Sequence, residues 1–250
     1  MHLFTFFKLI HSTNGIVLRT IKYGETSVVA SIFTELFGIQ SYIVNGVRTS
    51  GKTSKAHFFQ PASMLEMQVY HNDLKNLQRI KDLKWAHLYK NIFSDVIKNS
   101  VALFMVELLQ KTLKQPEMNE NLFHLCEDAF LHLDVAEKEI TANFAVYFSI
   151  RIAQISGFSL QNNYSEKKNI FSIKDGNFVE ENSAEMEFIT PQLSRDFSEM
   201  LKAIHPNDLR EIKMNGKTRS AMLKIMESFY GWHVHEFGKM KTLSILSAIL

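Results

Sequence analysis

Residues 27–46 read Ser-Val-Val-Ala-Ser-Ile-Phe-Thr-Glu-Leu-Phe-Gly-Ile-Gln-Ser-Tyr-Ile-Val-Asn-Gly, and this stretch decides the fold. Its β-branched and aromatic residues form two runs, 27–33 and 39–44, with Gly38 between them and an Asn-Gly turn pair after the second. Shorter runs of the same kind occupy residues 15–19, 64–70 and 77–80. Four or five short antiparallel strands in about eighty residues predict a small β-barrel, because closure removes the exposed edges of short strands.

The apolar period changes after Leu83, from the alternation of a strand to the spacing of a helix. Apolar residues fall at helical spacing from Val101 to Leu109, and Gly157 ends a long apolar helix. Further helices are expected over residues 122–133, 141–155, 194–204, 218–230 and 240–249.

These periods predict an α+β protein with two domains. The barrel is expected over residues 1–82 and an all-helical domain over residues 83–250, with a polar insertion at 160–190. The 250 residues are 46% hydrophobic, which excludes an intrinsically disordered chain. The single cysteine, Cys126, makes an intramolecular disulfide impossible and disfavours a cysteine-based zinc site, so a reducing cytoplasm fits. No run of about eighteen apolar residues occurs, so no membrane partner is expected.

The charge is unevenly distributed along the chain. The net charge is only +2, but residues 1–83 carry nine Lys or Arg and five Asp or Glu. No acidic residue lies between Glu35 and Glu66, and that gap holds Arg48, Lys52 and Lys55. A basic loop between two barrel strands can follow a phosphate backbone. The alternative interpretation is a solvated surface loop, and composition alone leaves both open.

The segment Gly46–Thr53 also fits the phosphate-binding pattern G-x-x-x-x-G-K-[ST]. Such a loop needs a following helix whose N-terminus faces the phosphates. Pro61 and the strand after it leave no room for that helix, and the preceding strand, 40–44, is not apolar throughout. A nucleotide hydrolase built on Gly46–Thr53 is therefore an alternative, as is a protein–protein adaptor based on the helical domain.

No catalytic arrangement of Ser, His and Asp, and no carboxylate pair in a glycine-framed turn, stands out in the sequence, so we expect no enzyme, cofactor or metal. Histidines occur in pairs at His233 and His235 and at His124 and His132, but no convincing further ligand is in register.

The order of short motifs resembles that of the RecO family of bacterial recombination mediators. The motifs are Gly15–Arg19, Tyr23-Gly24-Glu25, Phe33-Thr34, Gly38, Gly46-Val47-Arg48, Gln60-Pro61, Leu65-Glu66, Arg151 before Gly157-Phe158, Thr218-Arg219 and Lys241-Thr242. The resemblance implies an N-terminal OB-fold barrel and a helical C-terminal domain. It also implies binding of single- and double-stranded DNA, annealing of complementary strands, contact with RecR and with the C-terminal tail of single-stranded-DNA-binding protein, and help in loading RecA. A cytoplasmic, nucleoid-associated location follows from the same role.

The sequence departs from the family in two places. Many members carry four zinc-binding cysteines after the Gly-aromatic pair, and residues 160–181 contain none. We expect a zinc-ribbon-like insertion without its cysteines, with strands at 170–173 and 177–179 around Asp175-Gly176. Asn45 stands where members often have lysine before the glycine, which removes one possible phosphate contact.

The residues expected to bind DNA are cations of the barrel and one aromatic residue. They are Arg19, Lys22, Tyr42, Arg48, Lys52 and Lys55, with Tyr23 a further candidate for stacking on bases. On the helical domain, Arg151, Arg219 and Lys224 are candidates for binding a partner protein, such as an acidic tail with an apolar end. For Arg151 the alternative is an ion pair inside the helical bundle.

Overall fold

A computed structural model describes residues 9–47, 55–180 and 189–249. Two of the predicted DNA-binding residues, Arg48 and Lys52, lie outside these ranges. The chain divides into two compact units, one of residues 1–88 with 113–127 and the other of residues 89–112 with 128–250. Each unit is considered by itself.

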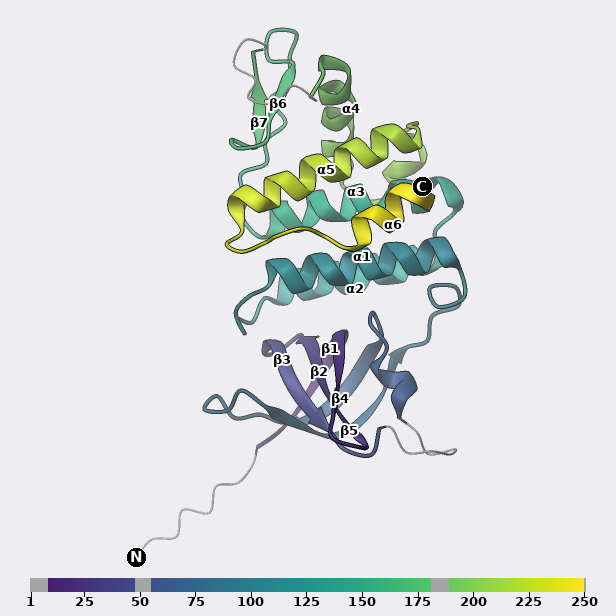
Figure 1. The fold of residues 1–250 in the computed structure, drawn as a ribbon, viewed down its shortest axis with the longest axis vertical. Helices are drawn as coiled ribbons and strands as arrows, with labels where there is room; N and C mark the ends of the chain where they lie inside the picture. The colour runs from purple at the N-terminus through teal and green to yellow at the C-terminus, as the bar shows by residue number, and fades with distance from the viewer. Residues whose placement is uncertain (1–8, 48–54, 181–188, 250) are drawn as a thin grey trace, which may run out of the picture. The chain divides into compact units, whose positions relative to one another are not determined.

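Five strands close into a barrel in the order β1-β2-β3-β5-β4 (Figure 1). Neighbouring strands pair antiparallel except β3 and β5, which pair in parallel through Tyr42 with Gln78 and Ile43 with Arg79. The strands are β1 (Ile10–Tyr23), β2 (Ser27–Thr34), β3 (Gly38–Val44), β4 (Met64–Tyr70) and β5 (Gln78–His87). The predicted OB-like barrel is confirmed.

The long strand β1 joins two neighbours at different heights. Its first half pairs with β4, from Ile10 with Tyr70 to Ile16 with Met64. Its second half pairs with β2, down to Tyr23 with Ser27, and a bulge lies between Val17 and Arg19. A bulge bends a strand and increases its twist, which is how one strand can serve both neighbours of a small barrel.

Alternate side chains of the strands fill the barrel interior. Because successive side chains point to opposite faces, every second residue contributes to this core. The buried set is Val17, Val28, Ala30, Ile32, Tyr42, Val44, Val47, Phe59, Leu65, Met67 and Val69. Phe59 comes from a short 3-10 turn, η1 (Ala56–Phe59), which precedes β4.

Helices build the second unit around a central helix (Figure 1), and most residues of that helix are buried. This helix, α3, contacts α1, α4, α5 and η3. Such all-round burial is expected for a helix in the middle of a bundle. The elements are α1 (Val96–Thr112), α2 (Glu120–Val135, shared between the units), α3 (Lys138–Ile155), α4 (Pro191–Leu201), η3 (Pro206–Arg210), α5 (Gly216–His233) and α6 (Thr242–Ile249).

Side chains at the helix ends explain where three of these helices begin. Thr190 accepts a hydrogen bond from the Leu193 amide at the start of α4, and Asn215 accepts one from Thr218 at the start of α5. The Glu107 carboxylate of α1 accepts hydrogen bonds from the Lys241 and Thr242 amides, and so caps α6. These polar contacts satisfy amides that no helical carbonyl can reach.

The predicted ribbon is present without its cysteines. β6 (Ile170–Ser172) and β7 (Asn177–Val179) pair antiparallel. Gly176 has φ of +67°, and a Cβ there would collide with the Ser159 carbonyl oxygen, so the turn requires glycine. Phe171 and Phe178 are buried, at a ring distance of 5.2 Å. Apolar packing of these two rings thus stabilises the ribbon, a role that a bound zinc ion has in ribbons with four cysteines.

The predicted helices are present and the α+β class is confirmed. Most extend beyond the predicted bounds, but α4 ends at Leu201 where 204 was predicted, and α6 begins at Thr242 where 240 was predicted. Two barrel strands differ most from the prediction. β1 runs from Ile10 to Tyr23 where residues 15–19 were predicted, and β5 runs from Gln78 to His87 where a short strand at 77–80 was predicted. No helix in the described parts of the chain is long and apolar enough to cross a membrane.

Candidate nucleic-acid interface

A cavity of about 500 Å³ lies against β3 in the barrel unit, and we call it the β3 pocket. Its walls come from the turn at Leu36 and Phe37, from residues 39–41 of β3, from the loop 71–78 and from residues 114–118. OB-fold barrels bind oligonucleotides at this strand and at the loop between strands four and five. The β3 pocket is therefore the place on this barrel where a single strand is expected to bind.

The side chains around the β3 pocket suit a polar ligand with negative charge. Gln40 and Asn76 offer amide groups, and Lys75 and Lys114 add two exposed ammonium groups. Asp73 is the acidic residue among the lining side chains. Amides can bind base edges and ammonium groups can neutralise phosphates, so the pocket combines the two kinds of contact that nucleic acids need.

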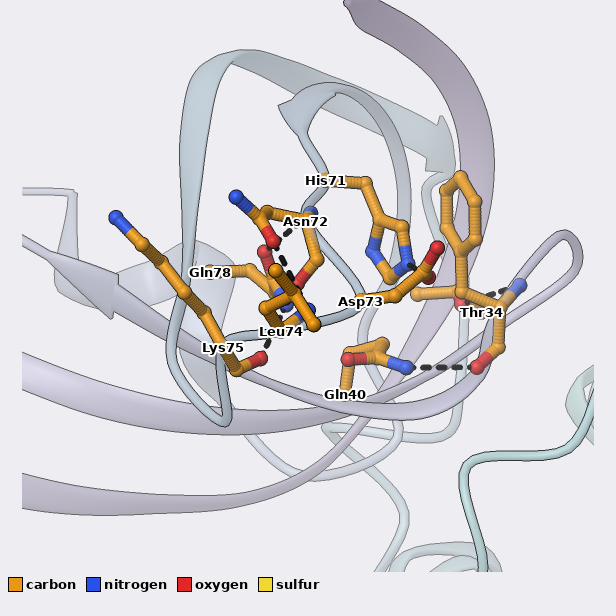
Figure 2. A network of polar contacts seen from close by, with 9 residues as sticks. Thr34, Gln40, His71, Asn72, Asp73, Leu74, Lys75 and Gln78 are labelled. Atoms are coloured by element: carbon orange, nitrogen blue, oxygen red, sulfur yellow. Dashed lines mark hydrogen bonds and ion pairs between the residues drawn. The ribbon is translucent and has the colours of Figure 1, made fainter. Parts of the chain in front are cut away.

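A buried glutamine holds the loop between β4 and β5 in shape (Figure 2). The Gln78 side chain donates to the Asn72 and Lys75 carbonyls at 2.9 and 2.6 Å, and accepts from the Asn72 amide at 3.0 Å. The Leu74 amide in turn donates to Asn72 Oδ1 at 2.9 Å. The loop is thus preorganised, although the Leu74 side chain at its tip is 95% exposed.

His71 attaches this loop to the barrel wall. Its ring stacks on Phe37 with centroids 3.8 Å apart, and its Nε2 lies 2.8 Å from Asp73 Oδ1 (Figure 2). On β3, Gln40 Nε2 donates to the Phe37 carbonyl at 2.9 Å. Turn, strand and loop are therefore linked, and the pocket they form does not depend on a ligand for its shape.

The predicted cations of β1 are exposed but do not form one surface. Arg19 and Lys22 lie three positions apart, so their side chains leave β1 on opposite faces. Lys55 is exposed immediately before η1. Tyr23, at the end of β1, is 54% exposed, so its ring is available for stacking.

The prediction that Tyr42 stacks on bases is wrong for this structure. Its side chain is 0% exposed and belongs to the barrel core. Burial raises the pKa of its hydroxyl, and the nearby Thr34 side chain opposes that rise only in part. A ring in the closed interior cannot contact a base without opening the barrel.

The structure adds cations that the sequence analysis did not single out. Lys75 in the β4–β5 loop and Arg79 and Lys81 on β5 are exposed, whereas Lys84 pairs with Glu66 at 2.9 Å. The sequence feature that could have revealed them is Arg79-Ile80-Lys81, in which two basic residues flank an apolar one, although Asp82 interrupts the alternation. That is the pattern of a strand with one wet, positive face.

The described residues do not support a phosphate-binding loop at Gly46–Thr53. β3 belongs to a largely antiparallel barrel, and the first residues described after the loop form only η1 before β4. Residues 48–54 themselves lie outside the described ranges. The arrangement of buried parallel strand, loop and long helix is thus not found around this segment.

Of the three residues predicted to bind a partner, Lys224 lines a cavity. This cavity, the α5–α6 pocket, measures about 560 Å³ and is also lined by Lys217, Ser220 and Ser247. Arg151 donates to Gln154 at 2.8 Å, so the described contacts show no ion pair for it. Arg219 donates to the Met214 carbonyl at 2.7 Å, and burial lowers the pKa of its guanidinium.

The side chains that suggested metal ligands in the sequence do not converge on one another. Cys126 is fully buried, and burial raises the pKa of its thiol, which disfavours the thiolate a metal requires. His233 packs on Phe229 at a ring distance of 4.3 Å, while His235 is exposed. Within the described ranges, the metal-ligating groups that do gather are Glu35, Glu120 and His124.

Comparison with known proteins covers nearly the whole chain. The family described as recombination protein O N terminal matches residues 9–89, and recombination protein O C terminal matches residues 94–243. Similar proteins include the DNA repair protein RecO of Christiangramia forsetii, 29% identical over 96% of this chain and 99% of that protein. Those of Azobacteroides pseudotrichonymphae and Flavobacterium johnsoniae are 27% and 28% identical, over 96% and 95% of this chain and 99% and 98% of theirs.

Proposed function

The chain belongs to the recombination protein O family, and from that premise we propose that it binds single- and double-stranded DNA and anneals complementary strands in recombinational repair. One observation carries the proposal. The region that matches the N-terminal family model is an OB-like barrel, and it has a preformed pocket at the place where OB-folds bind oligonucleotides.

Annealing requires little chemistry beyond charge neutralisation. Two phosphate backbones repel each other, and a protein that supplies cations to both lowers that repulsion. The exposed cations Lys55, Lys75, Arg79 and Lys81, with Arg19 and Lys22 on β1, can supply this charge. We include Arg48 and Lys52 in the interface because they lie in the same acid-free segment as Lys55.

The test is DNA binding and annealing by the full chain. A triple variant, Arg48→Glu, Lys52→Glu and Lys55→Glu, and a double variant, Lys75→Glu and Lys114→Glu, are compared with a control, Lys213→Glu, at an exposed lysine of the helical unit. If about four cations contact a single strand, log affinity falls against log salt with a slope of about −3. Both barrel variants are expected to flatten this slope and slow annealing, and the control is not.

Unchanged annealing in the triple variant would show that the loop carrying Arg48, Lys52 and Lys55 is not part of the DNA interface. An unchanged salt slope in the double variant would show the same for the β3 pocket. Wild-type protein that forms no complex with an oligonucleotide at low salt would contradict the proposal as a whole.

We assign the DNA-binding role to the barrel, which comprises the predicted residues 1–82 together with residues 83–88 and 113–127 of the same compact unit, and the partner-binding role to the rest of the predicted helical domain, residues 83–250. RecR and the C-terminal tail of single-stranded-DNA-binding protein are the proposed partners, and RecA loading is the outcome. The α5–α6 pocket supports a site for an acidic tail with an apolar end, since Lys217 and Lys224 line it. This role places the protein at the nucleoid in the cytoplasm.

A labelled peptide with the acidic tail sequence tests this assignment by fluorescence anisotropy. Lys217→Glu with Lys224→Glu is expected to abolish peptide binding, while Lys168→Glu, an exposed control outside the pocket, is not. The same pocket favours an adaptor function as the second candidate. A full chain that binds the peptide but no DNA would favour that adaptor.

A further inference from the structure

An imidazole and three carboxylates meet where the β2–β3 turn faces the first turns of α2. His124 Nε2 lies 3.7 Å from Glu35 Oε1 and 3.6 Å from Glu120 Oε1. On the other side of the ring, Nδ1 lies 3.4 Å from Glu127 Oε2. All four side chains belong to the barrel unit, so their relative placement is part of one compact body.

The packing around this group fixes the two segments that supply it. Phe33, at the end of β2, packs against Phe123 of α2 with ring centroids 5.4 Å apart. Gly38, after the turn, lies so close to the Glu117 backbone that a Cβ there would collide with the carbonyl oxygen. Neighbouring apolar and backbone contacts thus hold together the two segments that carry the donors.

The spacing of the donor atoms fits a metal ion better than a set of hydrogen bonds. One donor atom each from Glu35, Glu120 and His124 lies within 4.8 Å of the others. Bonds of about 2.0–2.2 Å to nitrogen and oxygen place tetrahedral donors about 3.4 Å apart. The two distances from Nε2, 3.6 and 3.7 Å, are near that spacing and too long for hydrogen bonds.

The second nitrogen of the ring is oriented as in many metal sites. In those sites the nitrogen that does not bind the metal donates to a carboxylate, which fixes the tautomer and the ring plane. Glu127 holds this position for Nδ1, so Nε2 is directed toward Glu35 and Glu120. Glu120 and His124 are four residues apart on α2, the spacing that places two ligands on one helix face.

The charge of the group also favours a cation. In the described chain no Lys or Arg forms an ion pair with Glu35, Glu120 or Glu127. The negative charge of these three carboxylates is therefore balanced by His124 alone among the described ion pairs. Imidazole nitrogen selects transition metals such as Zn²⁺ over Mg²⁺ and Ca²⁺, which prefer oxygen alone.

We propose that Glu35, Glu120 and His124 bind a divalent transition metal ion of the Zn²⁺ class, with Glu127 orienting the imidazole and water completing the coordination. The ion would join the β2–β3 turn to the start of α2, two segments far apart in the sequence, at a site separate from the β3 pocket. The buried Cys126 takes no part.

The experiment titrates the full chain, first treated with a chelator, with ZnCl₂ by calorimetry and with CoCl₂ by visible absorption. Glu35→Gln, Glu120→Gln and His124→Ala are compared with His132→Ala, an exposed histidine two turns further along α2. We expect one ion at this site, a rise of the melting temperature with Zn²⁺, and about a tenfold or greater loss of affinity in each ligand variant. The control should bind as wild type does.

Glu120 is exposed, so its glutamine variant leaves folding intact, which circular dichroism checks. Wild-type affinity in Glu120→Gln and His124→Ala, equal loss in His132→Ala, or no binding at all would overturn the proposal. None of these results depends on DNA binding, so failure here is distinguishable from failure of the proposed function.

Discussion

Replacing the buried Gln78 by leucine is expected to loosen the β4–β5 loop while leaving the barrel closed. Leucine has similar bulk and suits a buried position, but it can neither donate to the Asn72 and Lys75 carbonyls nor accept from the Asn72 amide. Three hydrogen bonds are therefore lost, and the backbone groups of the loop lose the partner that fixes them.

The magnitude follows from those three bonds. A protein hydrogen bond contributes about 0.5–1.5 kcal/mol net, and a buried group left without a partner costs more. Asn72 and Lys75 lie in an exposed loop, so water can reach the freed groups. We therefore expect the lower half of the range, about 1.5–3 kcal/mol, which corresponds to roughly 10- to 150-fold faster local opening.

Hydrogen exchange measured by mass spectrometry on peptides covering residues 71–78 is the direct assay. The matched control is Gln68→Leu, the same substitution at an exposed position of β4. In Gln78→Leu the loop peptides should exchange faster, and affinity for oligonucleotides should fall if the loop forms part of the interface. Equal exchange in the two variants would refute the conclusion that Gln78 organises the loop.

Three further predictions concern single positions. Gly38→Ala should lower the free energy of unfolding by about 2–4 kcal/mol in urea titrations, because φ is +62° and the Glu117 backbone blocks the Cβ. The control Gly24→Ala has the same φ but open space around the Cβ, so it should cost only about 1 kcal/mol. Equal losses in the two variants would contradict the close approach of Gly38 to Glu117. Burial acts to raise the pKa of Glu107, but hydrogen bonds from Thr242 and Lys241 and the charge of Lys111 lower it. The ionised carboxylate therefore stabilises the fold at pH values above the pKa that Glu107 has in the unfolded chain, and this stabilisation disappears as the pH falls through its pKa in the folded protein. A pH series of thermal melts checks this: Glu107→Gln should have a lower melting temperature than wild type at neutral pH, and the two melting temperatures should converge in acid. Tyr42→Leu, which removes the aromatic ring and keeps the position apolar, should leave the DNA affinity of the folded protein unchanged in anisotropy titrations, because the ring is buried in the barrel core; a loss comparable to that of Tyr23→Ala would show that the ring reaches bases after all.

The periodicity of apolar residues predicted most helices and strands but not the full length of two strands. The alternating run at 64–70 gave β4 with its correct bounds, and the apolar helix ending before Gly157 gave most of α3. β1 and β5 proved longer than predicted because many of their additional residues are polar and exposed, although Leu83 and Trp85 of β5 pack against the barrel core. Strand pairing, which a single sequence does not display, keeps those residues in the sheet.

The site was harder to predict than the fold. The segment 39–44 has apolar residues on both faces, so the pattern did not show that Tyr42 faces inward with Val44 while Ile39 lines the β3 pocket. Closure of the barrel decides which face is buried. Likewise, Lys114 and His124 reach the barrel unit from sequence beyond β5, a proximity that only the folded chain reveals.

The parallel pairing that closes the barrel is its shortest ladder, limited to Tyr42 with Gln78 and Ile43 with Arg79. We call this β3–β5 pairing the seam of the barrel. Gln78 thus forms part of the seam through its backbone and holds the β4–β5 loop through its side chain. Mechanical load on that loop is transmitted to the seam first. When the molecule is pulled or heated, we expect the cylinder to split there, while the long ladders of β1 still hold.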